Sequence, residues 1–182
     1  MTAHRLSVFV TGGTGFIGTP LVRSLGERGH QVRTLVRAEG RNKLPPDCEP
    51  VLGNALDATS YAGRIYPSET FVQLVGVSHP SPAKAAEFQA IDRESALGAI
   101  KSAKQAEVQH FIYLSVAQPA PVMKSYIAVR AECENALRRS GMKATIVRPW
   151  YVLGPGHRWP YLLLPITGFS NNFLPHALEP SV

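Results

Sequence analysis

The residues with the clearest capacity for chemistry are the glycines of residues 11–18, which read Thr-Gly-Gly-Thr-Gly-Phe-Ile-Gly. An apolar run precedes them and an amphipathic stretch follows, so a strand is expected to turn sharply into a helix whose first amides can bind an anion. In such a loop Gly12 permits the turn, Gly15 lets a pyrophosphate approach the backbone, and Gly18 lets the helix pack on the strand. We predict a dinucleotide site rather than an ordinary tight turn. The expected cofactor contacts here are Thr11, Gly12, Thr14, Gly15, Phe16, Ile17 and Gly18.

A second group of reactive residues follows the predicted strand at 110–114. Ser115 comes directly after that strand, and Tyr126 and Arg130 stand at the start of the next predicted helix. Positions i and i+4 share one helical face, so Tyr126 and Arg130 should point the same way. A serine, a tyrosine and a cation beside a nicotinamide are suited to hydride transfer, with Tyr126 as general acid or base and its pKa lowered by the neighbouring cation. Taken alone, Tyr126 would be read as an amphipathic aromatic residue at a helix start.

The choice between NADP and NAD depends on Arg37, which follows the predicted second strand. Binders of NAD usually place an acid near this point to hold the ribose hydroxyls, whereas an arginine accommodates a 2′-phosphate. Arg41 and Lys43 add to the positive field, while Glu39 offers an acid that could hold a ribose instead. We expect NADP as the cofactor, with NAD as the alternative.

Two further strand ends contribute expected contacts. Asn54 and Ala55 follow the third strand, and Leu74, Val75 and Gly76 come at the end of the fourth. The latter three are small or apolar, which suits an adenine flank and a ribose lying against the backbone. Ligands of parallel sheets bind beyond the carboxyl ends of the strands, where all of these residues fall.

The elements that must position these residues alternate between strand and helix. This alternation predicts an α/β fold, a doubly wound parallel sheet (a Rossmann fold) with helices on both faces. Asp57 is expected to cap a short helix. The expected strands are 6–11, 31–36, one ending near 52, 70–75, 110–114 and 143–147, and the expected longer helices are 15–28, 83–104 and 125–139.

Composition and charge restrict the class of protein to which the chain can belong. The chain has 182 residues, 45% of them hydrophobic and 18% charged, which suits one domain over residues 1–156 with a short segment, 157–182, after it. Cys48 and Cys133 are too few for a disulfide framework or a metal site. No apolar run approaches the ~20 residues of a membrane span, and no signal peptide is visible. The net charge of +6 is spread along the chain, so we expect a cytoplasmic protein that acts on a small molecule, without nucleic acid or membrane.

The chain resembles the atypical or extended short-chain dehydrogenase/reductases, close to the NmrA-like branch and to an accessory subunit of complex I. The loop at residues 11–18 matches the family's cofactor loop, Ser115 its active-site serine and Tyr126 the tyrosine of its Tyr-x-x-x-Lys motif. Ile91-Asp92 resembles the Val-Asn of many members. Arg148 begins a segment similar to the one that contacts the nicotinamide side in the family. The resemblance therefore implies cofactor contacts at Pro149, Trp150 and Val152.

The chain departs from the family pattern at three points. Arg130 stands where the family has the lysine that holds the nicotinamide ribose, and Asn54 stands where many relatives have Asp. Past residue 156 only a minimal substrate lobe is expected. Its apolar residues 161–164 are read as a core helix face or, alternatively, as a docking surface. Two functions stay open: an oxidoreductase or epimerase with an atypical Tyr-x-x-x-Arg motif, or a non-catalytic dinucleotide-binding sensor or accessory subunit of a larger complex, with a homo-oligomer possible in either case.

Overall fold

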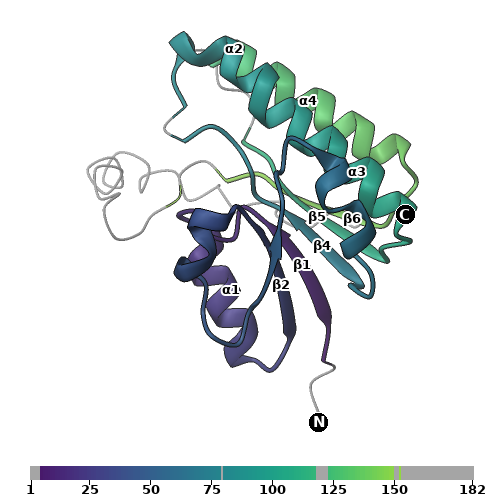
Figure 1. Cartoon of the computed structure of the whole chain (residues 1–182). Helices are drawn as coiled ribbons and strands as arrows, with labels where there is room; N and C mark the ends of the chain where they lie inside the picture. The colour runs from purple at the N-terminus through teal and green to yellow at the C-terminus, as the bar shows by residue number, and fades with distance from the viewer. Residues whose placement is uncertain (1–4, 79, 118–122, 150–151, 153–182) are drawn as a thin grey trace, which may run out of the picture.

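A computed structural model of the chain describes residues 5–78, 80–117, 123–149 and 152. Six parallel strands form one sheet in the order β3-β2-β1-β4-β5-β6 (Figure 1). The strands are β1 (Ser7–Thr11), β2 (Gln31–Val36), β3 (Glu49–Leu52), β4 (Thr70–Gln73), β5 (His110–Leu114) and β6 (Ala144–Val147). This is the predicted doubly wound sheet of the Rossmann type.

The strand order reverses at β1, whose neighbours are β2 and β4. Thr11, the last residue of β1, pairs with Leu35 of β2 and with Gln73 of β4. The carboxyl ends of the three strands therefore lie together. Ligands of open α/β sheets bind at this kind of switch point, so the glycine turn after Thr11 is placed where a cofactor is expected.

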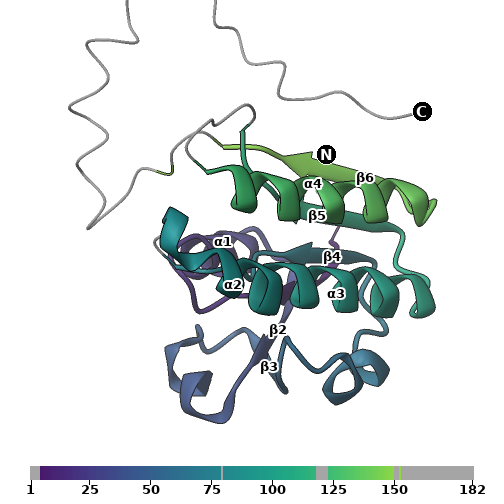
Figure 2. The same cartoon turned by 90° about the horizontal axis from the view of Figure 1, so that it is seen from above.

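Helices cover both faces of the sheet. Helix α1 (Gly18–Glu27) lies on one face, and α3 (Glu94–Gln105) and α4 (Lys124–Arg139) lie on the other. Figure 2 shows α4 beside the helical run formed by α2 (Ala85–Glu87) and α3. Because successive side chains of β1 point to opposite faces of the sheet, they pack in two separate core clusters. Val8 and Val10 pack in the cluster that contains Val22 of α1, while Phe9 packs in the larger cluster with residues of α3 and α4.

The predicted bounds of β2 and β5 are confirmed, and Asp57 caps a short 3₁₀ turn by accepting from the Thr59 N–H. The predicted helix 15–28 is too long, because α1 begins only at Gly18, after the glycine turn. The predicted strand 70–75 ends at Gln73. The predicted helix 83–104 is interrupted by a π-helical stretch, Phe88–Arg93. π-Turns of this kind are frequent at functional sites, and this one contains Asp92.

No helix in the described part of the chain is long and apolar enough to cross a membrane. The predicted second segment, 157–182, with its run at 161–164, lies outside the described residues.

Candidate functional site

The glycine turn has the geometry that phosphate binding requires. Gly12 has a φ of +75°, which favours glycine, and a Cβ on it would lie 3.0 Å from the backbone carbon of Leu74. A Cβ on Gly18 would collide with the carbonyl oxygen of Gly12, so this glycine is needed for helix packing. A Cβ on Gly15 would come near only the Gly12 carbonyl oxygen, at 3.2 Å. Apart from this contact, the space beside the Gly15 Cα is open among the described residues.

The N-terminus of α1, next to this open space, is not neutralised by the helix's own side chains. Its N-cap residue, Ile17, makes no side-chain cap hydrogen bond, and the first turn of this fully described helix contains no acidic residue. Thr14 and Phe16, also predicted contacts, belong to the same turn. The partial positive charge of the helix end is available to an anion, so the turn fits the pyrophosphate of a dinucleotide.

Arg37 follows β2 and is strongly exposed. Its Nε lies 3.3 Å from the Glu39 carboxylate, and their side chains are 76% and 69% accessible. An exposed ion pair of this kind contributes little free energy, so either partner can exchange it for a ligand. Arg41 and Lys43 lie in the last turn of the 3₁₀ segment Ala38–Lys43, close in sequence to the pair.

The other predicted cofactor contacts lie at the ends of β3 and β4. The Asn54 side-chain oxygen accepts from the Leu56 N–H at 3.0 Å, and Ala55 packs against the core. Leu74 and Val75 lie against Gly12. Gly76 has a different reason to be glycine. A Cβ there would collide with the Arg130 guanidinium and come within 2.9 Å of an Asp92 carboxylate oxygen.

Asp92 and Arg130 form a buried ion pair beneath this loop. The Arg130 Nη2 lies 2.5 Å from Asp92 Oδ1, and the side chains are 5% and 0% accessible. The second oxygen of Asp92 accepts from the Val77 N–H at 2.9 Å. Arg130 Nη1 donates to the Leu114 carbonyl at 2.7 Å and to the Tyr113 hydroxyl at 3.3 Å. Arg130 thus joins α4 to the end of β5 and, through Asp92, to the loop after β4.

Tyr126 lies over this ion pair. The Arg130 guanidinium carbon is 5.0 Å from the centre of the Tyr126 ring, and Phe88 packs against the same ring at 4.9 Å. Burial raises the pKa of the Tyr126 hydroxyl, and the opposing effect of Arg130 is smaller. The predicted lowering of this pKa is therefore wrong in its net direction, because desolvation of the phenolate outweighs the cation. At neutral pH Tyr126 is a neutral phenol that can donate a proton.

Ser115 is bound to a residue that the sequence analysis missed. Its Oγ lies 2.6 Å from Oε1 of Glu134, whose side chain is 4% accessible. Arg148 binds both oxygens of the same carboxylate, with Nε at 2.9 Å and Nη2 at 2.7 Å, and Arg138 adds a contact at 3.2 Å. A signal existed in the sequence, since Glu134 lies one turn beyond Arg130 on the helix face already singled out.

The structure brings Ser115, Tyr126 and Arg130 to one end of the sheet. No hydrogen bond joins the Ser115 and Tyr126 hydroxyls within the described part of the chain, and each contacts a different charged group. Pro149 is adjacent, because its carbonyl accepts from the Ala117 N–H at 3.1 Å. Val152 is half-buried, and the predicted contact Trp150 lies outside the described residues.

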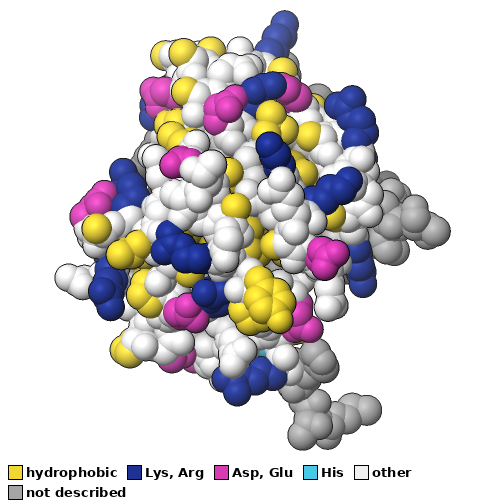
Figure 3. All heavy atoms as spheres, turned by 45° about the vertical axis from the view of Figure 1, so that its right-hand side comes forward, with side chains coloured by type: hydrophobic (Ala, Val, Ile, Leu, Met, Phe, Trp, Pro, Cys, Tyr) yellow, Lys and Arg dark blue, Asp and Glu magenta, His cyan; other side chains and the backbone are white. Residues whose placement is uncertain are grey.

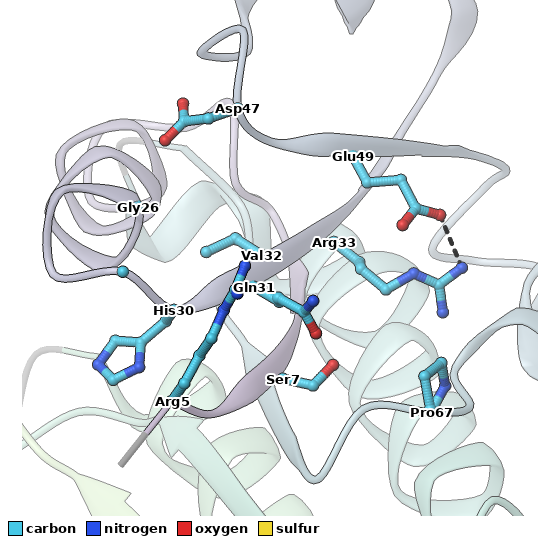
Figure 4. Close-up of a pocket in the computed structure, with 11 residues that line it drawn as sticks. Arg5, Ser7, Gly26, His30, Gln31, Val32, Arg33, Asp47, Glu49 and Pro67 are labelled. Atoms are coloured by element: carbon cyan, nitrogen blue, oxygen red, sulfur yellow. Dashed lines mark hydrogen bonds and ion pairs between the residues drawn. The ribbon is translucent and has the colours of Figure 1, made fainter. Parts of the chain in front are cut away.

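A cavity of about 580 Å³ lies at the opposite end of the strands, by the amino ends of β1 to β3 (Figure 4). Arg33 and Glu49 line it and bind each other at 2.8 Å, and Asp47, Arg5 and His30 also line it. It lies away from the glycine turn. On the face shown in Figure 3, basic and acidic side chains are interspersed with apolar ones.

Comparisons with known proteins identify the family of this chain and proteins similar to it. A family model described as NAD(P)H-binding matches residues 12–158. A ceramide reductase of Caulobacter vibrioides is 30% identical over 157 residues, which is 85% of this chain and 49% of that protein. A 3-beta-hydroxysteroid dehydrogenase of Mycolicibacterium neoaurum is 31% identical over 112 residues, 58% of this chain and 31% of that protein. The chain thus spans less than half the length of these two relatives.

Among solved structures, the Bordetella bronchiseptica enzyme WbmH in complex with NAD+ has a similar fold. Its TM-score is 0.71 at 23% sequence identity, and the match covers 91% of this chain and 64% of that one. At this identity the likeness supports the fold alone.

Proposed function

The chain belongs to the NAD(P)H-binding family, and from this premise we propose that it is a short-chain dehydrogenase-type oxidoreductase that prefers NADP(H) and reduces a carbonyl group of a small organic substrate. The proposal is supported by three neighbouring features at the carboxyl ends of the strands. The glycine turn follows β1, Ser115 follows β5, and Arg130 joins the Leu114 carbonyl to the ring of Tyr126. The name of the Caulobacter relative, a reductase, supports the same direction of reaction.

In this proposal each part of the site has one task. The glycine turn and the first turn of α1 hold the pyrophosphate, and Arg37 holds the 2′-phosphate. When bound, NAD(P)H supplies the hydride that is added to the carbonyl carbon. The Tyr126 phenol donates its proton to the carbonyl oxygen and recovers a proton from water afterwards. Arg130 packs against the face of the Tyr126 ring and, paired with Asp92, holds the start of α4 in place.

A non-catalytic function is the second candidate, and one observation favours it. The family lysine holds the nicotinamide ribose, whereas Arg130 is buried and engaged by Asp92, Leu114 and Tyr113. A dinucleotide-binding sensor or accessory subunit needs the glycine turn but not a mobile cation in this place. Turnover of NADPH separates the two candidates.

Replacing Tyr126 with phenylalanine tests the catalytic candidate. With NADPH and a panel of small ketones, aldehydes and quinones, we expect kcat/KM to fall by about 10²–10⁴-fold, because the proton donor is lost. The pKa of Tyr126 is raised, so the phenol persists above neutral pH and the rate should stay level from about pH 7 to 9.

Tyr66→Phe, at a residue 78% exposed, is the matched control. Brisk turnover that Tyr126→Phe leaves unchanged contradicts the role of Tyr126. Nucleotide binding without turnover in any variant favours the sensor or accessory function.

Replacing Arg37 with glutamate tests the choice of cofactor. The new carboxylate would repel a 2′-phosphate and could bind ribose hydroxyls, so we expect NADPH affinity to fall roughly tenfold or more while NADH affinity is kept or improved. Arg28→Glu makes the same change of charge at the other end of α1 and should leave both affinities unchanged. Equal affinity of the unmodified protein for NADPH and NADH, measured by titration, would overturn the preference.

A further inference from the structure

A chain of buried hydrogen bonds crosses the core at the carboxyl ends of β1 and β4. The Thr11 hydroxyl donates to the Gln73 side-chain oxygen, and the Gln73 amide nitrogen lies 3.2 Å from the Ser95 hydroxyl. The Ser95 hydroxyl also lies 3.2 Å from the Asp92 carbonyl oxygen. All four residues are at most 1% exposed. Polar groups buried this deeply are costly unless they are hydrogen-bonded, so removing one member leaves its neighbour short of a partner.

The direction of these hydrogen bonds is fixed from one end of the chain to the other. A carbonyl oxygen only accepts, so the Ser95 hydroxyl directs its proton to the Asp92 carbonyl and must accept from Gln73. The part of Gln73 that faces Ser95 is therefore its NH₂ group, and its oxygen accepts from Thr11. A primary amide carries a donor and an acceptor side by side without a charge. Glutamine thus suits this position, where one side chain has to meet both needs.

One end of the chain lies at the glycine turn. Thr11 is the last residue of β1 and directly precedes Gly12, which has the φ of +75° that begins the turn. The bond from Thr11 to Gln73 ties the carboxyl end of β1 to that of β4, where the two strands already pair. Because the Thr11 side chain is fully buried, its hydroxyl acts on the turn from the core side and does not touch a ligand.

The other end lies at the π-helical stretch, to which the Asp92 carbonyl belongs. The same stretch shapes the surroundings of Tyr126 in two ways. Phe88 packs on the Tyr126 ring at 4.9 Å, and the Asp92 carboxylate binds Arg130, whose guanidinium carbon lies 5.0 Å from the centre of that ring. π-Helical stretches are rare and interrupt the α-helical hydrogen-bond pattern. The bond from Ser95 therefore helps to fix where the residues around Tyr126 lie.

We propose that Gln73 is a positioning residue, which holds the glycine turn and the surroundings of Tyr126 in register with each other without touching nucleotide or substrate. This inference rests on the proposed function, which places the nucleotide at the glycine turn and the proton donor at Tyr126. Gln73 acts on the turn through Thr11 and on the surroundings of Tyr126 through Ser95. Breaking one half of the chain should therefore disturb one part of the site and spare the other.

Three variants of the full chain separate the two halves. Thr11→Val and Ser95→Ala each remove one hydroxyl, and Gln73→Met removes the amide while keeping a long unbranched side chain. Titration with NADPH, followed by nucleotide fluorescence, reports on the glycine turn. The NMR signal of the Tyr126 ring reports on the other end without nucleotide, substrate or turnover. It is recorded with ring-labelled tyrosine and assigned with Tyr126→Phe.

The three variants should differ in which of the two measurements they change. We expect Thr11→Val and Gln73→Met to raise the Kd for NADPH roughly fivefold, the effect of one net hydrogen bond, and Ser95→Ala to leave it unchanged. We expect Ser95→Ala and Gln73→Met to shift the Tyr126 signal and Thr11→Val to leave it in place. Gln73→Met alone should change both, because its amide belongs to both halves.

Two other buried hydroxyls provide matched controls. Thr70 lies at the amino end of β4 and is 7% exposed, and Ser102 lies on α3 and is 2% exposed. Thr70→Val and Ser102→Ala should lower the unfolding temperature without changing the Kd for NADPH or the Tyr126 signal. If the Gln73→Met variant fails to fold by circular dichroism, the contrast between Thr11→Val and Ser95→Ala decides the matter alone.

The outcomes are distinct. The expected division between the variants supports the inference. A network that only stabilises the core would lower the unfolding temperature in Thr11→Val, Ser95→Ala and Gln73→Met while leaving both measurements on the folded proteins unchanged, and this result overturns the inference. Thr11→Val and Ser95→Ala variants that each change both measurements overturn it as well. In either case NADPH binding by the unmodified protein leaves the proposed function standing. Failure of the unmodified protein to bind NADPH overturns the proposed function and the inference with it.

Discussion

Replacing Gly15 with valine is expected to raise the dissociation constants for NADPH and NADH by at least about 100-fold, or about 2.7 kcal/mol. The reason is local. Among the described residues, a Cβ on Gly15 comes near only the Gly12 carbonyl oxygen, so the added side chain would occupy the open space that we assign to the pyrophosphate. Circular dichroism and thermal unfolding should show that the sheet is intact, because Gly15 contributes little to the core.

Two other glycines provide controls for this change. A Cβ on Gly63 would meet no atom of the described residues within 4 Å, so Gly63→Val should leave binding unchanged. Gly18→Ala should instead destabilise the fold, because its Cβ would collide with the Gly12 carbonyl. A folded Gly15→Val variant that keeps the affinity of the unmodified protein would show that the pyrophosphate does not bind at this turn.

Replacing Arg130 with leucine is expected to cost about 3–5 kcal/mol of the free energy of unfolding, because it removes the cationic partner of a buried carboxyl group whose pKa burial already raises. Asp92 is 0% exposed, and besides Arg130 its hydrogen-bond partners in the described part of the chain include the Val77 N–H. Urea unfolding followed by circular dichroism measures this cost. The loop at Gly76 should loosen as well, since it packs directly on the ion pair.

The double variant Asp92→Asn/Arg130→Leu separates charge from packing. Asparagine keeps an oxygen that can accept from the Val77 N–H and removes the unpaired charge, so part of the lost stability should return. Arg93→Leu, at a neighbouring residue whose ion pairs with Glu94 and Glu132 are exposed to solvent, should have a much smaller effect. Equal losses for Arg130→Leu and Arg93→Leu would show that the buried pair does not stabilise the fold.

The fold was predictable from the sequence because its signals are local. β2 and β5 are short β-branched or aromatic runs bounded by loops, and both were predicted with their observed bounds. The glycine turn was predicted together with the strand before it and the helix after it. The predicted start of α1, at residue 15, was too early. Residues 15–17 have types that are compatible with a helix, but they belong to the glycine turn before α1.

The parts of the site that were not predicted depend on contacts between distant residues. Glu134 meets Ser115 and Arg148 only once β5, α4 and β6 are assembled. The raised pKa of Tyr126 follows from burial, which the spacing of Tyr126 and Arg130 does not reveal. The π-helical stretch that contains Asp92 leaves no periodic signal in the sequence. Local sequence patterns thus identified the reactive residues, but their hydrogen-bond partners and protonation states depend on how the folded chain packs.

The central claim is that this chain binds a nicotinamide dinucleotide at the turn after β1 and prefers the phosphorylated form. Isothermal titration calorimetry of the purified chain with NADPH and with NADH, in separate experiments at equal ionic strength, tests it most directly. We predict saturable binding of one nucleotide per chain, tighter for NADPH than for NADH. The absence of binding by either nucleotide at millimolar concentration, with the protein folded, would contradict the account.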